Sequence, residues 1–235
     1  KGARAFAGDR ISQAVSAQQH RTAVEVNLEA LSANLLVFQQ ALQPGTKVMV
    51  MVKAAAYGIG SLEVARRLAY LGVDYLAVAY VDEGVKLRQG GISLPILVLN
   101  PEPSAFANLF RYELEAEVYT LDQLKELQGY ASVEKRDLNI HLKLETGMSR
   151  MGFAEEELND LILHLQKHPW IKVNSIFSHL AASEDPGEDP FTERQVRVFQ
   201  KGYERITTAI GYLPMRHILN SSGIARFPLY QMEMV

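Results

Sequence analysis

Short apolar runs of strand length alternate with amphipathic stretches of helix length along most of the chain. Residues 47–52 (KVMVMV) are rich in apolar side chains and lack alternating polar positions, which is typical of a strand buried on both faces of a parallel sheet. The strands predicted from here onward cover residues 47–52, 75–79, 95–99, 115–119, 139–144, 173–177, 217–219 and 230–235. The helices predicted between them cover residues 61–71, 82–89, 104–110, 121–130, 155–167 and 191–210.

Repeated strand–helix units of this length argue for a parallel sheet, and eight strands predict an α/β fold of the TIM (β/α)8 barrel type. The alternative is a doubly wound open sheet, but the G-x-G-x-x-G fingerprint of its dinucleotide-binding version follows none of the predicted strands. The eighth predicted strand has no helix after it, so we expect a barrel that is only just complete at Val235.

The segment before the barrel predicts further elements. Residues 22–26 (TAVEV) alternate as a half-buried strand should, and Asn27 is a candidate N-cap for a helix over residues 28–42. Because a closed barrel has no free edge, we expect the strand at residues 22–26 to pair with a second domain. Residues 1–20 are mostly small and polar, which predicts a linker or the tail of a preceding domain, with the barrel domain at residues 21–235.

Composition excludes several functional classes. A net charge of −3 and a pI near 6.1 give no electrostatic case for binding nucleic acid or an anionic membrane. The absence of cysteine excludes disulfides and cysteine metal ligands, and is consistent with a reducing compartment. No apolar run approaches the ~20 residues of a membrane span, and the first residues lack the apolar core of a signal peptide. We therefore expect a cytoplasmic protein, with no membrane association and no metal site.

Lys53 lies where the first barrel strand meets its loop. Burial of its stem disfavours the ammonium and makes the amine available as a nucleophile or base, although a lysine there can also snorkel to the surface. The stretch VKAAAYGIG resembles the pyridoxal-phosphate (PLP) motif of bacterial alanine racemases, V-K-A-N-A-Y-G-H-G. The resemblance implies that Lys53 binds PLP covalently and acts as a catalytic base, and that Tyr57 reaches the cofactor phosphate. Ala55 and Ile59 depart from the motif, so we expect different local hydrogen bonds.

A second motif, HLKLETGMSRMGF, follows the fifth predicted strand and resembles the racemase sequence K-x-D-T-G-M-x-R-x-G, with Glu145 in place of the aspartate. Arg150 is suited to clamp a carboxylate, and the resemblance implies a catalytic role near the cofactor and the substrate carboxylate. Lys143 shares a side of its strand with His141. It matches a lysine that is often carbamylated in this family, and a carbamate would avoid two buried cations facing each other. The alternatives are that Lys143 snorkels or pairs with Glu145.

Two further motifs follow the sixth and seventh predicted strands. His179 in IFSHLAASED stands at a strand end, where a histidine is more often structural than catalytic, but the resemblance implies a catalytic residue beside the cofactor ring. Asn220 and Ser221 in HILNSSGIARFP open a small polar turn that is suited to receive a phosphate. The resemblance implies that both residues bind the cofactor phosphate.

The resemblance covers residues 22–235 and has four motifs in the order found in the family. It implies that the intact parent protein is a PLP-dependent isomerase that interconverts L-alanine and D-alanine for the peptidoglycan of the cell wall. It also implies a homodimer, because the second base is a tyrosine from the C-terminal β-domain of the partner subunit. A racemase needs opposed bases, so we expect this chain alone to have little or no activity.

Alternative interpretations remain open at this point. KGARAF at residues 1–6 resembles the closing segment of Mur ligases, which suggests that the chain comes from a Mur ligase–alanine racemase fusion protein. A single-domain PLP-binding protein that carries or regulates cofactor without turnover would have a similar length. A non-catalytic scaffold is disfavoured because Lys53, Tyr57, Arg150, His179 and Ser221 are all present.

Overall fold

The computed structural model describes residues 24–235. The predicted linker and the ligase-like segment lie outside the described residues, as do residues 22 and 23 of the first predicted strand. The described part of that strand prediction is wrong: residues 24–26 form no strand, and Val24 is 81% exposed. An alternating segment forms a strand only where another strand pairs with it, and none of the described strands does so.

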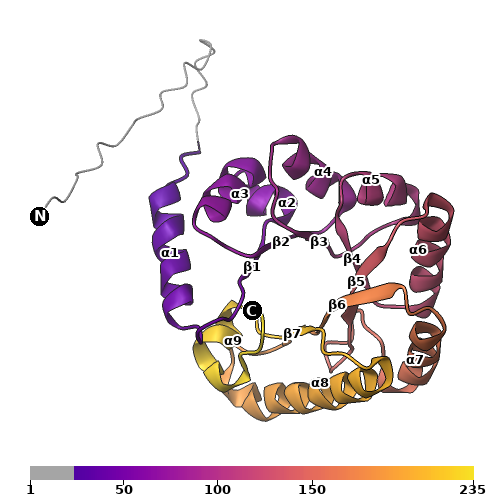
Figure 1. Cartoon of the computed structure of the whole chain (residues 1–235). Coiled ribbons are helices and arrows are strands. Elements are labelled where there is room, and N and C mark those ends of the chain that lie inside the picture. Colours follow the sequence, from indigo (N-terminus) through magenta and orange to yellow (C-terminus); the bar gives the residue numbers. More distant parts are fainter. Residues whose placement is uncertain (1–23) are drawn as a thin grey trace, which may run out of the picture.

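The described residues form one sheet of seven parallel strands in the sequential order β1 to β7, curved into a ring with helices on its outer side (Figure 1). This arrangement confirms the predicted α/β barrel. The strands are β1 (Met49–Met51), β2 (Tyr75–Val78), β3 (Ile96–Val98), β4 (Glu115–Val118), β5 (Leu138–Lys143), β6 (Ile171–Phe177) and β7 (Met215–His217).

Seven helices of the described residues agree closely with those predicted, whereas α2 and α9 were not predicted as helices. The helices are α1 (Leu28–Gln40), α2 (Lys53–Gly58), α3 (Ser61–Tyr70), α4 (Val81–Gln89), α5 (Phe106–Arg111), α6 (Leu121–Glu134), α7 (Leu158–Lys167), α8 (Asp189–Ile210) and α9 (Ser221–Arg226), with short 3-10 turns at Pro103–Ala105, Glu155–Glu157, Pro186–Glu188 and Pro228–Tyr230. Asn27 caps α1 as predicted, through hydrogen bonds from the amides of Glu29 and Ala30. Within residues 24–235, no helix combines the length and apolar character needed to cross a membrane.

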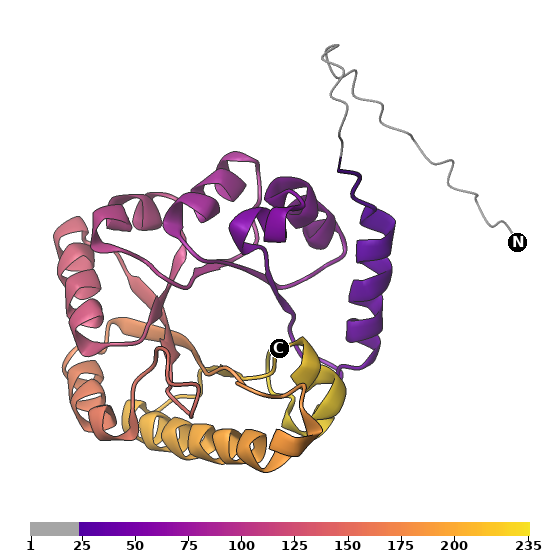
Figure 2. The same ribbon diagram turned by 180° about the vertical axis from the view of Figure 1, so that it is seen from behind.

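The eighth predicted strand closes the ring through backbone hydrogen bonds without forming a regular strand. Val235 accepts from the amide of Met49 at 2.8 Å and donates to the carbonyl of Lys47 at 2.9 Å. On the other side, the Met234 amide donates to the carbonyl of Arg216 at 3.2 Å. Both views show this end of the chain beside β1 and β7 (Figures 1 and 2). The barrel is therefore closed between its first and last strands.

The two faces of the curved sheet are both buried. The main core lies between the strands and the surrounding helices, with Leu76, Ile140 and Phe199 fully buried in it. A smaller apolar cluster inside the barrel joins Ala77 of β2 and Leu97 of β3 to Phe177 of β6. Between β4 and β7 the rest of the interior is polar. Its buried side chains include Glu117, His141, Lys143, Ser175 and His217. This polar half positions the candidate site.

Candidate functional site

A cavity of about 540 Å³ lies in the barrel and extends toward α1. All seven of the site residues predicted from the sequence line it. They are Lys53, Tyr57, Lys143, Arg150, His179, Asn220 and Ser221. Five of them, Lys53, Lys143, His179, Asn220 and Ser221, lie at or just after the carboxyl ends of strands, where parallel barrels place their functional groups.

Lys53 is half-buried and begins α2 directly after β1. The next four residues have left-handed backbone angles, with φ between 51° and 59° from Ala54 to Tyr57. Left-handed conformations are unfavourable for residues with a Cβ atom, and consecutive ones are rare, so other contacts must hold this turn. The turn directs Tyr57 to the same cavity as Lys53. The sequence predicted a loop here but not its handedness.

Glu83 holds the left-handed turn from the neighbouring helix α4. One oxygen of its carboxylate accepts from the Ala54 amide at 2.6 Å, and the other accepts from the Ala79 and Tyr80 amides at 2.7 Å and 3.2 Å. The turn is also closed by hydrogen bonds from the Ala56 amide to the Val52 carbonyl and from the Gly60 amide to the Ala55 carbonyl. Gly60 is the N-cap of the following helix, α3, which begins at Ser61 as predicted.

The loop after β5 doubles back on the strand and presents Arg150. The Phe153 amide donates to the Lys143 carbonyl at 2.8 Å, and the Glu145 amide donates to the Phe153 carbonyl at 3.0 Å. The Glu145 carboxylate accepts from the Gly147 and Arg150 amides, so it braces its own loop. Arg150 is exposed, and its side chain reaches the cavity.

Lys143 forms an ion pair with Glu117, a residue that the sequence analysis did not identify. Lys143 Nζ lies 2.8 Å from Glu117 Oε1, with both side chains buried. The predicted alternative of a pair with Glu145 is wrong, because Glu117 projects into the barrel from the adjacent strand β4 whereas Glu145 turns back onto its own loop. Burial raises the pKa of Glu117 to about 7, although the charge of Lys143 opposes this rise.

His179 lies among positive charges. Burial, and then the charges of Arg150, Lys143 and Lys53, lower the pKa of His179. This histidine is therefore neutral at physiological pH. The cluster of cations makes the cavity attractive to an anionic ligand.

Asn220 and Ser221 lie at the start of α9. The Asn220 side-chain oxygen accepts from the Gly223 amide at 2.9 Å and from the Ser183 hydroxyl at 2.7 Å, and so caps the helix. Its amide nitrogen faces the Leu180 carbonyl at 3.4 Å. The side chain of Asn220 is thus used within the fold, whereas Ser221 is exposed at the cavity.

A chain of buried hydrogen bonds runs below the cavity. His217 Nε2 lies 3.0 Å from Ser175 Oγ, and Ser175 Oγ lies 2.7 Å from His141 Nδ1. His141 Nε2 lies 2.5 Å from the Glu115 carboxylate. Burial would raise the pKa of Glu115, but the hydrogen bond and charge of His141 lower it. Burial and the proximity of His141 lower the pKa of His217 to about 3.

When both histidine rings are neutral, these contacts define the proton positions along the chain. The Glu115 carboxylate can only accept a hydrogen bond, so a neutral His141 carries its proton on Nε2. The other ring nitrogen of His141, Nδ1, then accepts a hydrogen bond from the Ser175 hydroxyl. Ser175 in turn accepts from the Nε2 proton of His217. The alternating motif of β4 (EAEV) gave the one available signal for Glu115 and Glu117, because it places both glutamates on one face.

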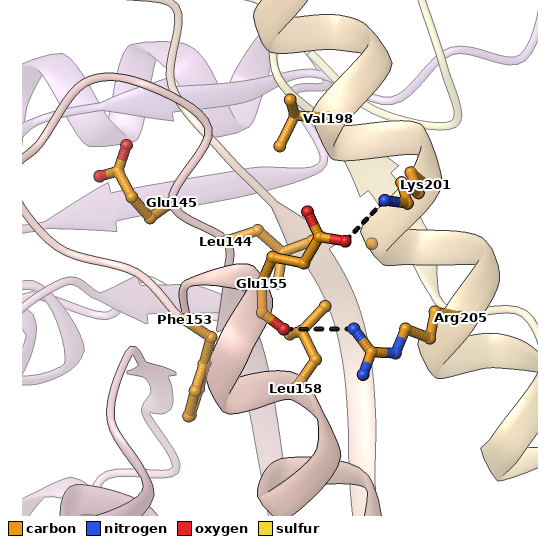
Figure 3. Close-up of a pocket in the computed structure, with 9 residues that line it drawn as sticks. Leu144, Glu145, Phe153, Glu155, Leu158, Val198, Lys201 and Arg205 are labelled. Carbon is orange, nitrogen blue, oxygen red and sulfur yellow. Dashed lines mark hydrogen bonds and ion pairs between the residues drawn. The ribbon is translucent and has the colours of Figure 1, made fainter.

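A second cavity, of about 20 Å³, lies between the loop after β5 and α8 (Figure 3). The Glu155 carboxylate pairs there with Lys201 at 2.6 Å, and its backbone carbonyl accepts from Arg205 at 3.2 Å (Figure 3). This cavity has room for about one water molecule, and none of the predicted site residues lines it. Residues 24–235 contain no group of three or more His, Asp or Glu side chains placed to hold a metal ion.

The fold agrees with comparisons to known proteins. A family model described as the N-terminal domain of alanine racemase matches residues 26–235. Among curated relatives, alanine racemase 1 of Oceanobacillus iheyensis is 36% identical over 90% of this chain and 57% of its own length. The alanine racemase of Sorangium cellulosum is 35% identical over 91% of this chain and 58% of its own length.

Solved structures give the same result. An alanine racemase of Clostridium difficile 630, in complex with cycloserine, superposes with a TM-score of 0.84 and 31% identity over 89% of this chain and 58% of that chain. An alanine racemase of Bartonella henselae with covalently bound pyridoxal phosphate has a TM-score of 0.79 at 23% identity, which supports the fold alone; the match covers 89% of this chain and 57% of that one. The chain spans somewhat more than half the length of the relatives it matches.

Proposed function

Because the chain belongs to the family of alanine racemase N-terminal domains, we propose that its barrel binds PLP at Lys53 and serves the racemisation of alanine. The observation that carries the proposal is the convergence of the seven predicted site residues on one cavity. Its volume of about 540 Å³ lies within the range of about 300–1,000 Å³ that is usual for small-molecule sites.

The residues at the cavity fit this anionic cofactor. Lys53 and Arg150 are cations without an ion-pair partner among the described residues, and their charges act on the half-buried His179. A phosphate and a substrate carboxylate would compensate these charges. The exposed hydroxyl of Ser221, held in place by the Asn220 cap, would donate to the phosphate.

When bound, PLP withdraws electrons and makes the α-proton of an amino acid acidic. Lys53 would hold the cofactor and move this proton at its Nζ atom on one face of the substrate. Arg150 would orient the substrate carboxylate through paired hydrogen bonds. His179, which is neutral at physiological pH, would pack beside the cofactor ring without adding a further positive charge.

Racemisation needs a second base on the opposite face of the substrate. Of the two lysines that the described residues place at the cavity, Lys143 is paired with Glu117, which leaves Lys53 as the available amine. We therefore expect little racemase activity from this chain by itself, and a homodimeric, cytoplasmic parent protein that supplies the second base. A Mur ligase domain upstream in the parent is part of the same proposal.

Reduction of a PLP-treated sample with borohydride tests the site. We expect a stable cofactor adduct that peptide mass spectrometry maps to Lys53 and that Lys53→Ala abolishes. Lys86→Ala, which changes an exposed lysine in α4, is the matched control and should leave the adduct unchanged. An adduct at other lysines only would refute the proposed site. High racemase activity in the chain alone would refute the need for a second base from elsewhere.

A further inference from the structure

The environment of Lys143 determines whether this lysine can be modified. Its Nζ atom lies 2.8 Å from Glu117 Oε1 and 5.6 Å from the centre of the Phe177 ring, over the ring face. The side chain of Glu117 is fully buried and that of Lys143 is 6% exposed. The ammonium therefore has a carboxylate on one side and an aromatic face on another, both of which favour the positive charge.

The resemblance to the racemase family implied a carbamate at Lys143, because an uncompensated buried cation would face Arg150. The structure shows a different source of negative charge. Glu117 lies close enough to Arg150 for the charge of the arginine to lower the pKa of this carboxyl. Above its pKa of about 7, Glu117 is a buried carboxylate paired with Lys143, and a carbamate is then not needed to balance the charge of the lysine.

Carbamylation would also be unfavourable next to Glu117. In that reaction the neutral Nζ atom attacks the carbon of carbon dioxide, an N–C bond forms as one C=O π bond opens onto its oxygen, and a proton leaves the nitrogen to water. Only a neutral amine has the lone pair that this attack needs, whereas the ion pair with Glu117 uses the ammonium form. The product would place a carbamate anion beside the buried carboxylate, where like charges repel strongly.

We infer that Glu117 is the built-in counterion of this site and holds Lys143 as an unmodified ammonium. The inference deepens the proposed function, since it assigns a positioning residue to the same cavity. Glu117 would act through Lys143, by fixing the charge and position of this side chain at the cavity. Its test needs neither cofactor nor turnover, so its failure and the failure of the proposed function can be told apart.

The test is carbon-13 NMR of the chain in ¹³C-bicarbonate, with the carbamate carbon as the signal. We expect no carbamate signal from the wild-type chain and a bicarbonate-dependent signal from Glu117→Gln, which removes the counterion at nearly constant volume. The signal should disappear in the Glu117→Gln, Lys143→Met double variant. Glu145→Gln is the matched control, because it neutralises a nearby glutamate whose carboxylate accepts hydrogen bonds from its own loop, and it should stay without a signal.

A wild-type signal that Lys143→Met removes would overturn the inference. Absence of a signal in both the wild-type chain and a folded Glu117→Gln variant would overturn the role of Glu117. Circular dichroism shows whether Glu117→Gln folds. If it does not, the ion pair is tested instead by titrating the Glu117 carboxyl carbon by NMR in the wild type and in Lys143→Met. We expect a higher pKa in Lys143→Met, whereas an unchanged pKa would contradict the ion pair.

Discussion

The carboxylate of Glu83 accepts a hydrogen bond from the amide of Ala54 at 2.6 Å, and this contact joins α4 to the residue directly after Lys53. The turn that begins at Ala54 is left-handed over four residues, none of which is glycine. Such a turn is strained, and Glu83 supplies part of the energy that holds it. The position of the lysine therefore depends on a glutamate in the next strand–helix unit.

Glu83→Ala should destabilise the chain by about 1.5–3 kcal/mol, because three backbone amides lose a charged acceptor. It should also weaken borohydride trapping of PLP at Lys53, since the turn loses its anchor. Urea unfolding and mass spectrometry measure the two effects. Asp82→Ala, one residue earlier and in an exposed pair with Lys86, should change stability by less than about 1 kcal/mol. Equal effects of the two variants would contradict the anchoring role.

Gly152→Ala should destabilise the loop that carries Arg150. Its φ is 139°, and an added Cβ would lie 2.4 Å from the Glu145 amide nitrogen, a backbone atom that cannot yield. We expect a loss of at least about 1–3 kcal/mol from the strained conformation alone. Thermal unfolding provides the measurement. Gly129→Ala in the middle of α6, where nothing lies within 4 Å, should instead stabilise by about 0.5–1 kcal/mol.

Glu117 should give the stability of the chain a distinctive pH dependence. Its folded-state pKa of about 7 exceeds the ordinary value of 4.5, so protonation favours the folded state. The contribution of Glu117 to the free energy of unfolding is fully present below pH 4.5 and is lost as the pH rises through 7. Urea unfolding at pH 5 and pH 8 should therefore show a loss of about 2 kcal/mol that is absent in Glu117→Gln. A variant with the same pH dependence as the wild type would exclude Glu117 as its source.

Ser175→Ala should interrupt the hydrogen-bonded chain between His141 and His217. Both ring nitrogens that face Ser175 would lose their partner in a buried position, which costs about 1–3 kcal/mol. Chemical unfolding measures the loss, and nitrogen-15 NMR should show that the Nε2–H form of His217 is no longer fixed. Ser132→Ala, an exposed position in α6, should stay within about 0.5 kcal/mol of the wild type.

His217 itself provides a test at acidic pH. Its pKa is lowered to about 3 from an ordinary value of 6.5, so the folded state favours the neutral ring. The resulting stability is present above pH 6.5 and is lost as the pH falls toward 3. We expect nitrogen-15 NMR to show a neutral His217 ring at pH 5, where an exposed histidine is mostly protonated. A charged ring at that pH would disagree with the buried geometry.

The strands and helices of the barrel could be predicted from sequence because each depends on a local pattern of apolar residues. The site residues at strand ends could be predicted because their motifs are contiguous in sequence. The handedness of the turn after Lys53 could not, since Ala54 is held by Glu83, which is 29 residues away. The described part of the strand predicted at residues 22–26 is not a strand, because alternation alone does not supply a pairing partner.

Glu117 could not be recognised for a different reason. Alternation of polar and apolar residues usually indicates a strand with one face in water, and EAEV in β4 has this pattern. In a closed barrel the polar face points inward, where Glu117 meets Lys143. The partner that compensates a buried lysine therefore became visible only when two adjacent strands were placed in register.

The hydrogen bonds that close the ring also constrain how the chain can fold during synthesis. Gln43 and Gln231, which are bonded to each other across this seam, are separated by 188 residues. Strand β1 and the residues that follow it leave the ribosome long before the segment that pairs with their free edge. Until that segment is synthesised, the early strands form at most an open sheet in which the edge of β1 is unpaired. An open sheet of this kind is prone to aggregation. Chaperone capture of nascent chains should accordingly last until residues 231–235 emerge.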